Sequence, residues 1–137
     1  MKAVTTWIFA LLITMAVTAA LAGANSSLFI NLTSDDGHRV NMALSFGKNQ
    51  LERGHPLTVF LNDRAVYVGT KAQTHRFSEQ QKMLTELMAK GASVIACPFC
   101  MKHYGVQPTE LLPGIAVGNP DLTGAALFRE DTRTLTW

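Results

Sequence analysis

Cys97 and Cys100 are the two residues of this chain whose type and spacing point most directly to chemistry. They are the only cysteines among 137 residues, and their CxxC spacing places two sulfur atoms within one turn of a helix. Free backbone N–H groups and the positive end of the helix dipole favour a thiolate over a thiol at a helix N-terminus. Because a thiolate attacks the sulfur atoms of other molecules, this pair indicates sulfur chemistry.

The residues around the pair predict a strand, a tight turn and a helix. The apolar run 94–96 reads as a buried strand, and Pro98 is suited to the first position of a helix. Cys97 is therefore expected at the N-cap and Cys100 one turn along, in a helix that ends near Tyr104. Both sulfur atoms should lie close to the start of that helix.

Alternating strands and helices position this segment. Apolar periodicity and breaker residues predict strands over residues 27–32, 56–61, 94–96 and 132–137, and helices over 38–53, 78–90 and 98–104, with a helical turn at 108–112 and a weak helix at 122–127. Residues 64–77 show no clear period, and we expect a long, partly ordered loop that shapes access to Cys97. The order of elements predicts one α/β domain over residues 27–137. Its largely parallel sheet should be covered by helices on both faces, as an α/β/α arrangement of three layers.

Polar residues follow three of the predicted strands. In parallel sheets the carboxyl ends of the strands meet at one edge, where ligands bind. The loop 34–37, the pair Asn62 and Asp63, and Cys97 are therefore expected to be neighbours. Asp35 and Asp36 could act as paired carboxylates, but capping of the first helix is the simpler expectation.

The first 24 residues have the features of a secretory signal peptide. Lys2 is followed by an apolar stretch and by a run of small residues that ends in Ala22-Gly23-Ala24. The uncharged stretch 3–27 is also long enough to span a bilayer, so an uncleaved N-terminal anchor is the alternative. In either case we expect a periplasmic or otherwise exported domain, in contact with a membrane only if the segment is uncleaved.

The composition limits the classes of function. The chain has 12 Lys and Arg side chains against 10 Asp and Glu, a formal net charge of +2. Without a basic stripe, it is not expected to bind nucleic acid. Two cysteines cannot build the disulfide framework of a small secreted scaffold, so the domain must be stabilised by an apolar core.

Several of these segments resemble the DsrE/DsrF-like family of small sulfur-relay proteins, including its TusD and YchN types. The resemblance covers most of residues 27–137: the opening strand with its polar turn, the helix ends at residues 51–54 and 84–91, and the block from Val94 to Val106. Within that block Cys97 lies eight residues before Gly105, the interval found in active family members.

The resemblance implies a five-stranded sheet, a homo-oligomer (a trimer or a hexamer), and a cysteine that carries sulfane sulfur as a persulfide. Cys97 takes that role here, and proteins or small sulfur species would be its sulfur donor and acceptor. Cys100 is assigned as a partner or resolving thiol that can attack the persulfide, release sulfide and leave a disulfide. Lys102 and His103 add positive charge or proton-transfer capacity. No cofactor is expected.

Four other interpretations of the cysteine pair remain open. One is the redox centre of a thiol–disulfide oxidoreductase, and another is a static structural pair. A third is a non-catalytic multimeric module that binds a small ligand and needs neither cysteine. The pair could also supply two ligands to a zinc ion, together with His103 and one of His38, His55 and His75. No second CxxC or paired histidine motif supports the zinc site.

Overall fold

A computed structural model of the chain describes residues 26–137. The predicted signal peptide or anchor, residues 1–24, lies outside this range. Between residues 26 and 137, none of the helices combines the length and the apolar character needed to cross a membrane.

The sheet has five strands, and every neighbouring pair of strands is parallel. The spatial order is β4-β3-β2-β1-β5, which puts the first strand between the second and the last. The strands are β1 (Leu28–Leu32), β2 (Leu57–Leu61), β3 (Ser93–Ala96), β4 (Ala116–Val117) and β5 (Arg133–Thr136). The predicted α/β class and strand number are confirmed, and only the two-residue β4 was not located from the sequence pattern.

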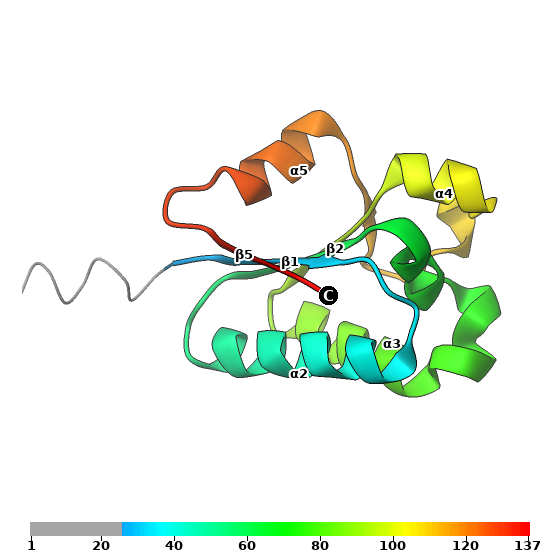
Figure 1. The fold of residues 1–137 in the computed structure, drawn as a ribbon, viewed down its shortest axis with the longest axis horizontal. Coiled ribbons are helices and arrows are strands. Elements are labelled where there is room, and N and C mark those ends of the chain that lie inside the picture. Colours follow the sequence, from blue (N-terminus) through cyan, green and yellow to red (C-terminus); the bar gives the residue numbers. More distant parts are fainter. Residues whose placement is uncertain (1–25) are drawn as a thin grey trace, which may run out of the picture.

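Helices cover both faces of this sheet, which gives the three layers seen in Figure 1. Helices α2 (Gly37–Glu52) and α3 (Thr74–Ala89) lie on one face, while α4 (Pro98–Tyr104) and α5 (Pro120–Leu127) lie on the other. Helix α2 begins where predicted, because the Asp36 carboxylate accepts a hydrogen bond from the Arg39 N–H at 2.9 Å. It ends before Gly54, whose φ of 91° is a conformation that favours glycine.

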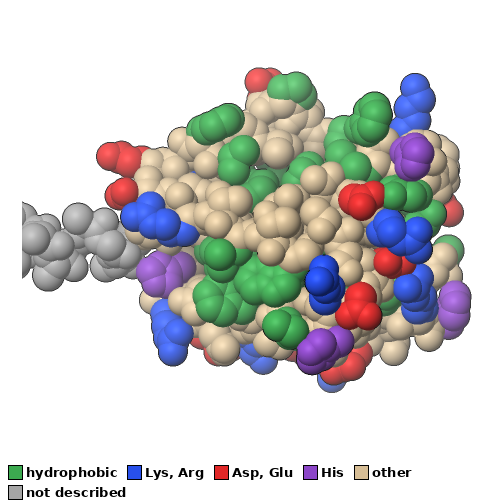
Figure 2. Space-filling view, in the orientation of Figure 1, with side chains coloured by type: hydrophobic (Ala, Val, Ile, Leu, Met, Phe, Trp, Pro, Cys, Tyr) green, Lys and Arg blue, Asp and Glu red, His purple; other side chains and the backbone are tan. Residues whose placement is uncertain are grey.

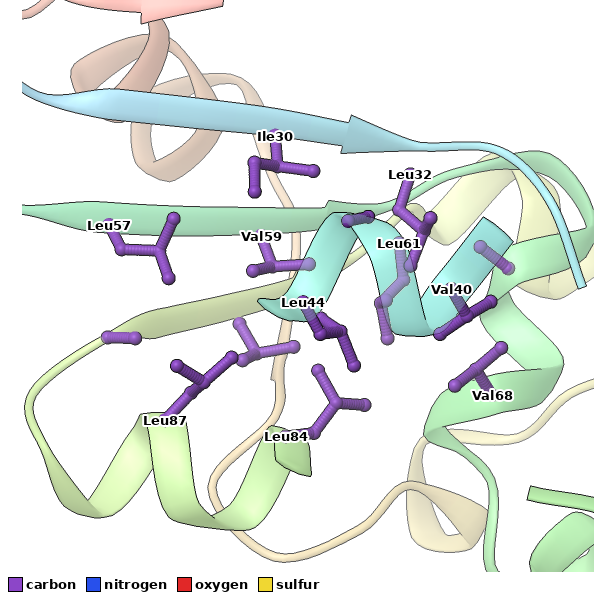
Figure 3. Close-up of a cluster of buried hydrophobic side chains, with 14 of the residues drawn as sticks. Ile30, Leu32, Val40, Leu44, Leu57, Val59, Leu61, Val68, Leu84 and Leu87 are labelled. Carbon is purple, nitrogen blue, oxygen red and sulfur yellow. The ribbon is translucent and has the colours of Figure 1, made fainter. Parts of the chain in front are cut away.

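The main apolar core fills the space between the sheet and the α2 and α3 pair (Figure 3). Alternate residues of the strands, such as Ile30 and Val59, point into it and meet Leu44 of α2 and Leu84 of α3. All four side chains have no exposed surface. Burial of each contributes about 1.5–3 kcal/mol, so this core contributes strongly to the stability of the domain.

The opposite face is covered more thinly. Helix α5 has no buried residue, and a hollow between it and the sheet is lined by Thr58, Ile95, Leu122 and Ala126, among others. On that side of the sheet Phe29 packs against Phe60, with ring centroids 6.0 Å apart. The helix therefore contacts the sheet mainly through small and half-exposed side chains.

The prediction of a long, partly ordered loop over residues 64–77 was wrong, because this segment is helical and partly buried. It forms two 3₁₀ helices, η1 (Asp63–Gly69) and η2 (Lys71–Gln73), and α3 starts at Thr74 rather than at residue 78. A kink at Phe77 (φ −123°, ψ 26°) separates the first turn of α3 from the part that was predicted. A 3₁₀ helix repeats every three residues, so it gives neither the period of 2 nor that of 3.6.

Side chains from the next helix keep this segment in place. Ala65, Val66 and Val68 are fully buried. The Gln81 amide of α3 donates hydrogen bonds to the carbonyl oxygens of Val68, at 3.1 Å, and Thr70, at 2.8 Å. Because buried carbonyl groups need such partners, Gln81 fixes the path of the chain from β2 to α3.

Candidate functional site

Cys97 lies at the carboxyl edge of the sheet, directly after β3. Its N–H donates to the Leu61 carbonyl oxygen at 2.9 Å, which ties it to the end of β2. Pro98 occupies the first turn of α4, and the Cys100 N–H donates to Cys97 Sγ at 3.4 Å. Cys97 is therefore the N-cap of α4, as predicted.

The two cysteines are close together but differ in exposure. Their sulfur atoms are 2.9 Å apart, and both are free thiols. Cys97 is half-buried, whereas Cys100 has only 9% of its surface exposed. Cys97 is therefore the more exposed of the two thiols, and Cys100 Sγ lies immediately beside Cys97 Sγ. A disulfide bond of about 2.05 Å needs only a small approach of the two atoms.

The turn between β2 and η1 surrounds the Cys100 sulfur atom. The Cys100 thiol donates to Asn62 Oδ1, with Sγ 3.0 Å from the oxygen atom, and the Asp63 N–H donates to Cys100 Sγ at 3.1 Å. Asp63 has a φ of 47°, which is uncommon for a residue other than glycine. Asn62 and Asp63 are thus neighbours of the cysteine pair, as predicted from their position at the carboxyl end of a parallel strand.

This environment holds Cys100 as a thiol. Burial, followed by the hydrogen bond with Cys97, raises the pKa of Cys100 from 9.0 to about 11, and the Asp63 N–H offsets only part of that rise. The expectation that the helix N-terminus favours a thiolate at both cysteines was therefore wrong for Cys100. For this residue, loss of hydration outweighs the stabilisation of the thiolate by the Asp63 N–H.

A small hollow opens beside Cys100 and is lined by Asp63, Phe99, His103 and Tyr104. The Phe99 side chain is 79% exposed, and the Tyr104 hydroxyl donates to the Asp63 carboxylate. That hydrogen bond raises the pKa of Tyr104. His103 therefore shares the surroundings of the cysteine pair.

Lys102 does not share this hollow. It lines a separate one, on another side of α4, with Pro98, Met101 and Val106 among its neighbours. Of the two basic residues expected to support the cysteines, only His103 lies on the same hollow as a cysteine.

Asp35 has a role that the sequence did not reveal. Asp36 alone caps α2, and the Asp35 carboxylate instead pairs with Arg64 at 2.9 Å and with Arg76 at 3.0 Å. The hydrogen bond from Arg64 is the main cause of the lowered pKa of Asp35. These contacts join the β1–α2 loop to η1 and α3 at the edge where the cysteines lie. Residues so distant in sequence gave no local signal of the pairing.

The zinc alternative gains no support from the geometry. Within residues 26–137, no three His, Cys, Asp or Glu side chains are grouped closely enough to hold a metal ion. His55 lies at the amino edge of the sheet, where its Nδ1 is 2.9 Å from the Ser26 carbonyl oxygen. It is thus at the end of β2 that is remote from Cys97.

Comparisons with known proteins agree with this fold. The sequence matches the DsrE/DsrF-like family over residues 12–131, whereas no curated protein matches it. A solved structure of MTH1491, a protein of unknown function from Methanobacterium thermoautotrophicum, is 20% identical with a TM-score of 0.69, covering 82% of this chain and 100% of that one. The YchN protein from E. coli is 18% identical with a TM-score of 0.60, covering 82% and 99%. BT1422 from Bacteroides thetaiotaomicron, a conserved protein of unknown function, is 22% identical with a TM-score of 0.60, covering 84% and 97%.

Proposed function

Because the chain belongs to the DsrE/DsrF-like family, we propose that it is a sulfur-relay protein that carries sulfane sulfur as a persulfide on Cys97. The observation that carries this proposal is the placement of Cys97. It caps α4 at the carboxyl edge of a parallel sheet, half-exposed, with a second thiol 2.9 Å from its sulfur atom. Family membership is consistent with sulfur relay, and the geometry suits a cysteine that reacts with molecules from solvent.

In the loading step, the Cys97 thiolate attacks the terminal sulfur of a polysulfide or a protein persulfide. The donor sulfur behind it leaves as a thiolate or a shorter polysulfide, and Cys97 retains one additional sulfur atom. In the transfer step, an acceptor thiolate attacks that outer sulfur and returns Cys97 to a thiolate. The two steps require only one cysteine, which is why exposure of Cys97 matters more than exposure of Cys100.

Cys100 is proposed as the partner thiol. When no acceptor arrives, it can attack Cys97 Sγ, displace the outer sulfur as hydrosulfide and leave a Cys97–Cys100 disulfide. Its burial, its single S–H and its 2.9 Å contact with Cys97 Sγ suit this second role. Reduction of the disulfide would then restore the carrier.

The short distance between the sulfur atoms also favours a second candidate function. A thiol–disulfide oxidoreductase would cycle the same pair between dithiol and disulfide without binding sulfane sulfur. This activity needs both thiols, whereas persulfide carriage needs only Cys97. The two functions are therefore separable with single substitutions.

The proposal also includes export. Residues 1–24 would direct the domain to the periplasm, and it would meet its sulfur donors and acceptors there.

The proposal further includes self-association. Figure 2 shows apolar side chains gathered over α2 beside β5; exposed Met42, Phe46 and Leu135 belong to these elements. Phe46 also contacts Trp137, with ring centroids 5.8 Å apart. We propose this surface as the contact between copies in a homo-oligomer, and Phe46→Ser should lower the mass measured by light scattering relative to the unsubstituted chain.

Intact mass after incubation with polysulfide tests the main proposal. The protein without substitutions, Cys97→Ser and Cys100→Ser are each desalted and weighed. We expect a gain of about 32 Da, one sulfur atom, in Cys100→Ser and no gain in Cys97→Ser. No gain in any protein, with a loss of about 2 Da that needs both cysteines, would favour the oxidoreductase instead.

A further inference from the structure

The Asn62 carboxamide is held in one orientation beside Cys100. Its Nδ2 donates to Asn31 Oδ1 at 3.2 Å, and its Oδ1 accepts the Asp63 N–H at 3.0 Å. Because a backbone N–H can only donate, the second contact requires the oxygen atom on that side. The same oxygen lies 3.0 Å from Cys100 Sγ. Asn62 therefore presents an acceptor, and not a donor, to the Cys100 sulfur atom.

Two acceptors compete for the single proton of Cys100. Asn62 Oδ1 lies at 3.0 Å and Cys97 Sγ at 2.9 Å from Cys100 Sγ, and a thiol has one S–H to donate. If the proton is on the Asn62 side, Cys97 Sγ is released from that contact and can react. If Cys100 ionises, the Asn62 oxygen faces a negative sulfur atom at the same distance. The acceptor therefore favours the thiol over the thiolate.

From this geometry we propose that Asn62 is a positioning residue that retains the Cys100 proton and so sets how long sulfane sulfur stays on Cys97. The inference rests on the proposed function, since it concerns the fate of the Cys97 persulfide. Asn62 would slow closure of the disulfide and leave time for transfer to an acceptor.

The reaction that Asn62 delays is balanced within the protein. The Cys100 thiolate forms a bond to Cys97 Sγ while the bond from Cys97 Sγ to the outer sulfur breaks. That outer sulfur leaves with the bonding electron pair as hydrosulfide and takes up the proton that Cys100 lost. The two cysteine sulfurs end as a disulfide, and the sulfane sulfur is reduced to sulfide.

Asp63, at the start of η1, has a complementary role in the same turn. Its N–H is directed at both Asn62 Oδ1 and Cys100 Sγ, at 3.0 and 3.1 Å. Cys97, the Asp63 carboxylate, His103 and Tyr104 are the other titratable groups close to Cys100. The Asp63 carboxylate already accepts the Tyr104 hydroxyl. Asn62 is neutral and does not titrate. Replacing it can therefore change the charge beside Cys100 while the titratable neighbours stay the same.

Two substitutions at Asn62 are predicted to act in opposite directions. Asp and Ser both keep an oxygen that can cap the next helix, so both should preserve η1. Asn62→Asp puts a negative charge beside Cys100 and should slow sulfide release from the loaded protein. Asn62→Ser has a shorter side chain with a rotatable hydroxyl, and should speed it. Below the Cys100 pKa, each unit of rise in that pKa lowers the thiolate fraction about tenfold. A rise of about one unit in Asn62→Asp would therefore slow sulfide release about tenfold.

The experiment loads each full-length protein with polysulfide, removes the excess, and follows sulfide release and intact mass over pH 6–10. The proposal predicts a pH profile displaced upward for Asn62→Asp and downward for Asn62→Ser. When Cys100→Ser is added to each variant, both should release sulfide at the same rate as Cys100→Ser alone, because no resolving thiol is left. Rates that change in the same direction in both variants, or that do not change, would overturn the role of Asn62. Failure of Cys100→Ser to load any sulfur would instead overturn the proposed function itself.

Discussion

The two faces of the sheet differ in how tightly they are covered and in what they carry. On the α2 and α3 face, strand residues such as Ile30 and helix residues such as Leu84 are fully buried in one continuous apolar core. On the other face, α5 buries no residue and leaves a hollow above the strands, and α4 carries the cysteine pair at the carboxyl edge. Stability and chemistry are therefore located on opposite sides of the same strands.

The cysteines nevertheless have a small apolar cluster of their own. It includes Val66, Ala96, Met101, Val106 and Leu111, together with Cys100 itself. Val66 comes from η1, part of the segment for which the sequence predicted only a partly ordered loop. The cluster explains why Cys100 is buried, whereas Cys97 packs against its margin and is only partly buried. The cysteine pair is therefore supported by its own packed side chains, although α5 covers the same face of the sheet only thinly.

The largest test of this difference compares one leucine from each face. Leu84→Ala removes a side chain with no exposed surface, whereas Leu122→Ala removes one from α5 that is 38% exposed. We expect Leu84→Ala to lower the free energy of unfolding by about 2–5 kcal/mol and Leu122→Ala by about 1 kcal/mol or less. Urea denaturation measures both, and equal losses would show that the two faces contribute alike.

Alkaline pH should reveal the burial of Cys100. Its pKa is raised to about 11 in the folded protein, whereas the unfolded thiol ionises near its ordinary value of 9.0. Below pH 9 both states keep the proton, so stability is unaffected. As the pH rises from 9 to 11 the unfolded state alone loses it, and the free energy of unfolding should fall by about 2 kcal/mol.

The matched control for this prediction is Cys100→Ser, which has no group that titrates at this position. Its stability should fall less than that of the unsubstituted protein between pH 9 and 11 in urea denaturation. Parallel curves would mean that Cys100 is more hydrated than its surroundings suggest.

Two glycines provide a further contrast, in which each substitution alone has a small effect. A Cβ at Gly69 of η1 would lie 2.7 Å from Leu61 Cδ1 and 3.0 Å from Ile115 Cδ1, while one at Gly124 of α5 would have no atom within 4 Å. Gly69→Ala should cost roughly 1–2 kcal/mol through overpacking. Gly124→Ala should stabilise the helix by about 0.5–1 kcal/mol. Melting temperatures that shift in the same direction would contradict the contrast in packing.

The sequence predicted those parts of the fold in which burial gives a regular period. Helix α2 lies against the main core on one side, so its apolar residues repeat at 3.6. Strands β1 and β2 are covered on both faces, so they appear as short apolar runs bounded by breaker residues. The CxxC helix was readable from Pro98 and from the glycine that ends it. The two-residue β4 is too short to show a period, and η1 has the period of a 3₁₀ helix.

The candidate site was predictable to a similar extent. The spacing of Cys97 and Cys100 predicted their positions on α4. Because Asn62 and Asp63 follow a parallel strand, they were expected at the same edge of the sheet, near the cysteines. Which side chain caps α2 and which forms ion pairs was not predictable, because Arg64 and Arg76 reach Asp35 only through the tertiary fold. The raised pKa of Cys100 likewise depends on burial by residues distant in sequence.

The most direct test of the account is to locate the added sulfur in the unsubstituted protein. After brief loading with polysulfide at neutral pH, rapid alkylation and peptide mass analysis distinguish a persulfide on Cys97 from one on Cys100. We predict the additional sulfur of about 32 Da on Cys97, with Cys100 carrying only the alkyl group. Sulfur found on Cys100, or a Cys97–Cys100 disulfide formed with no persulfide at any time, would contradict the claim that Cys97 is the carrier.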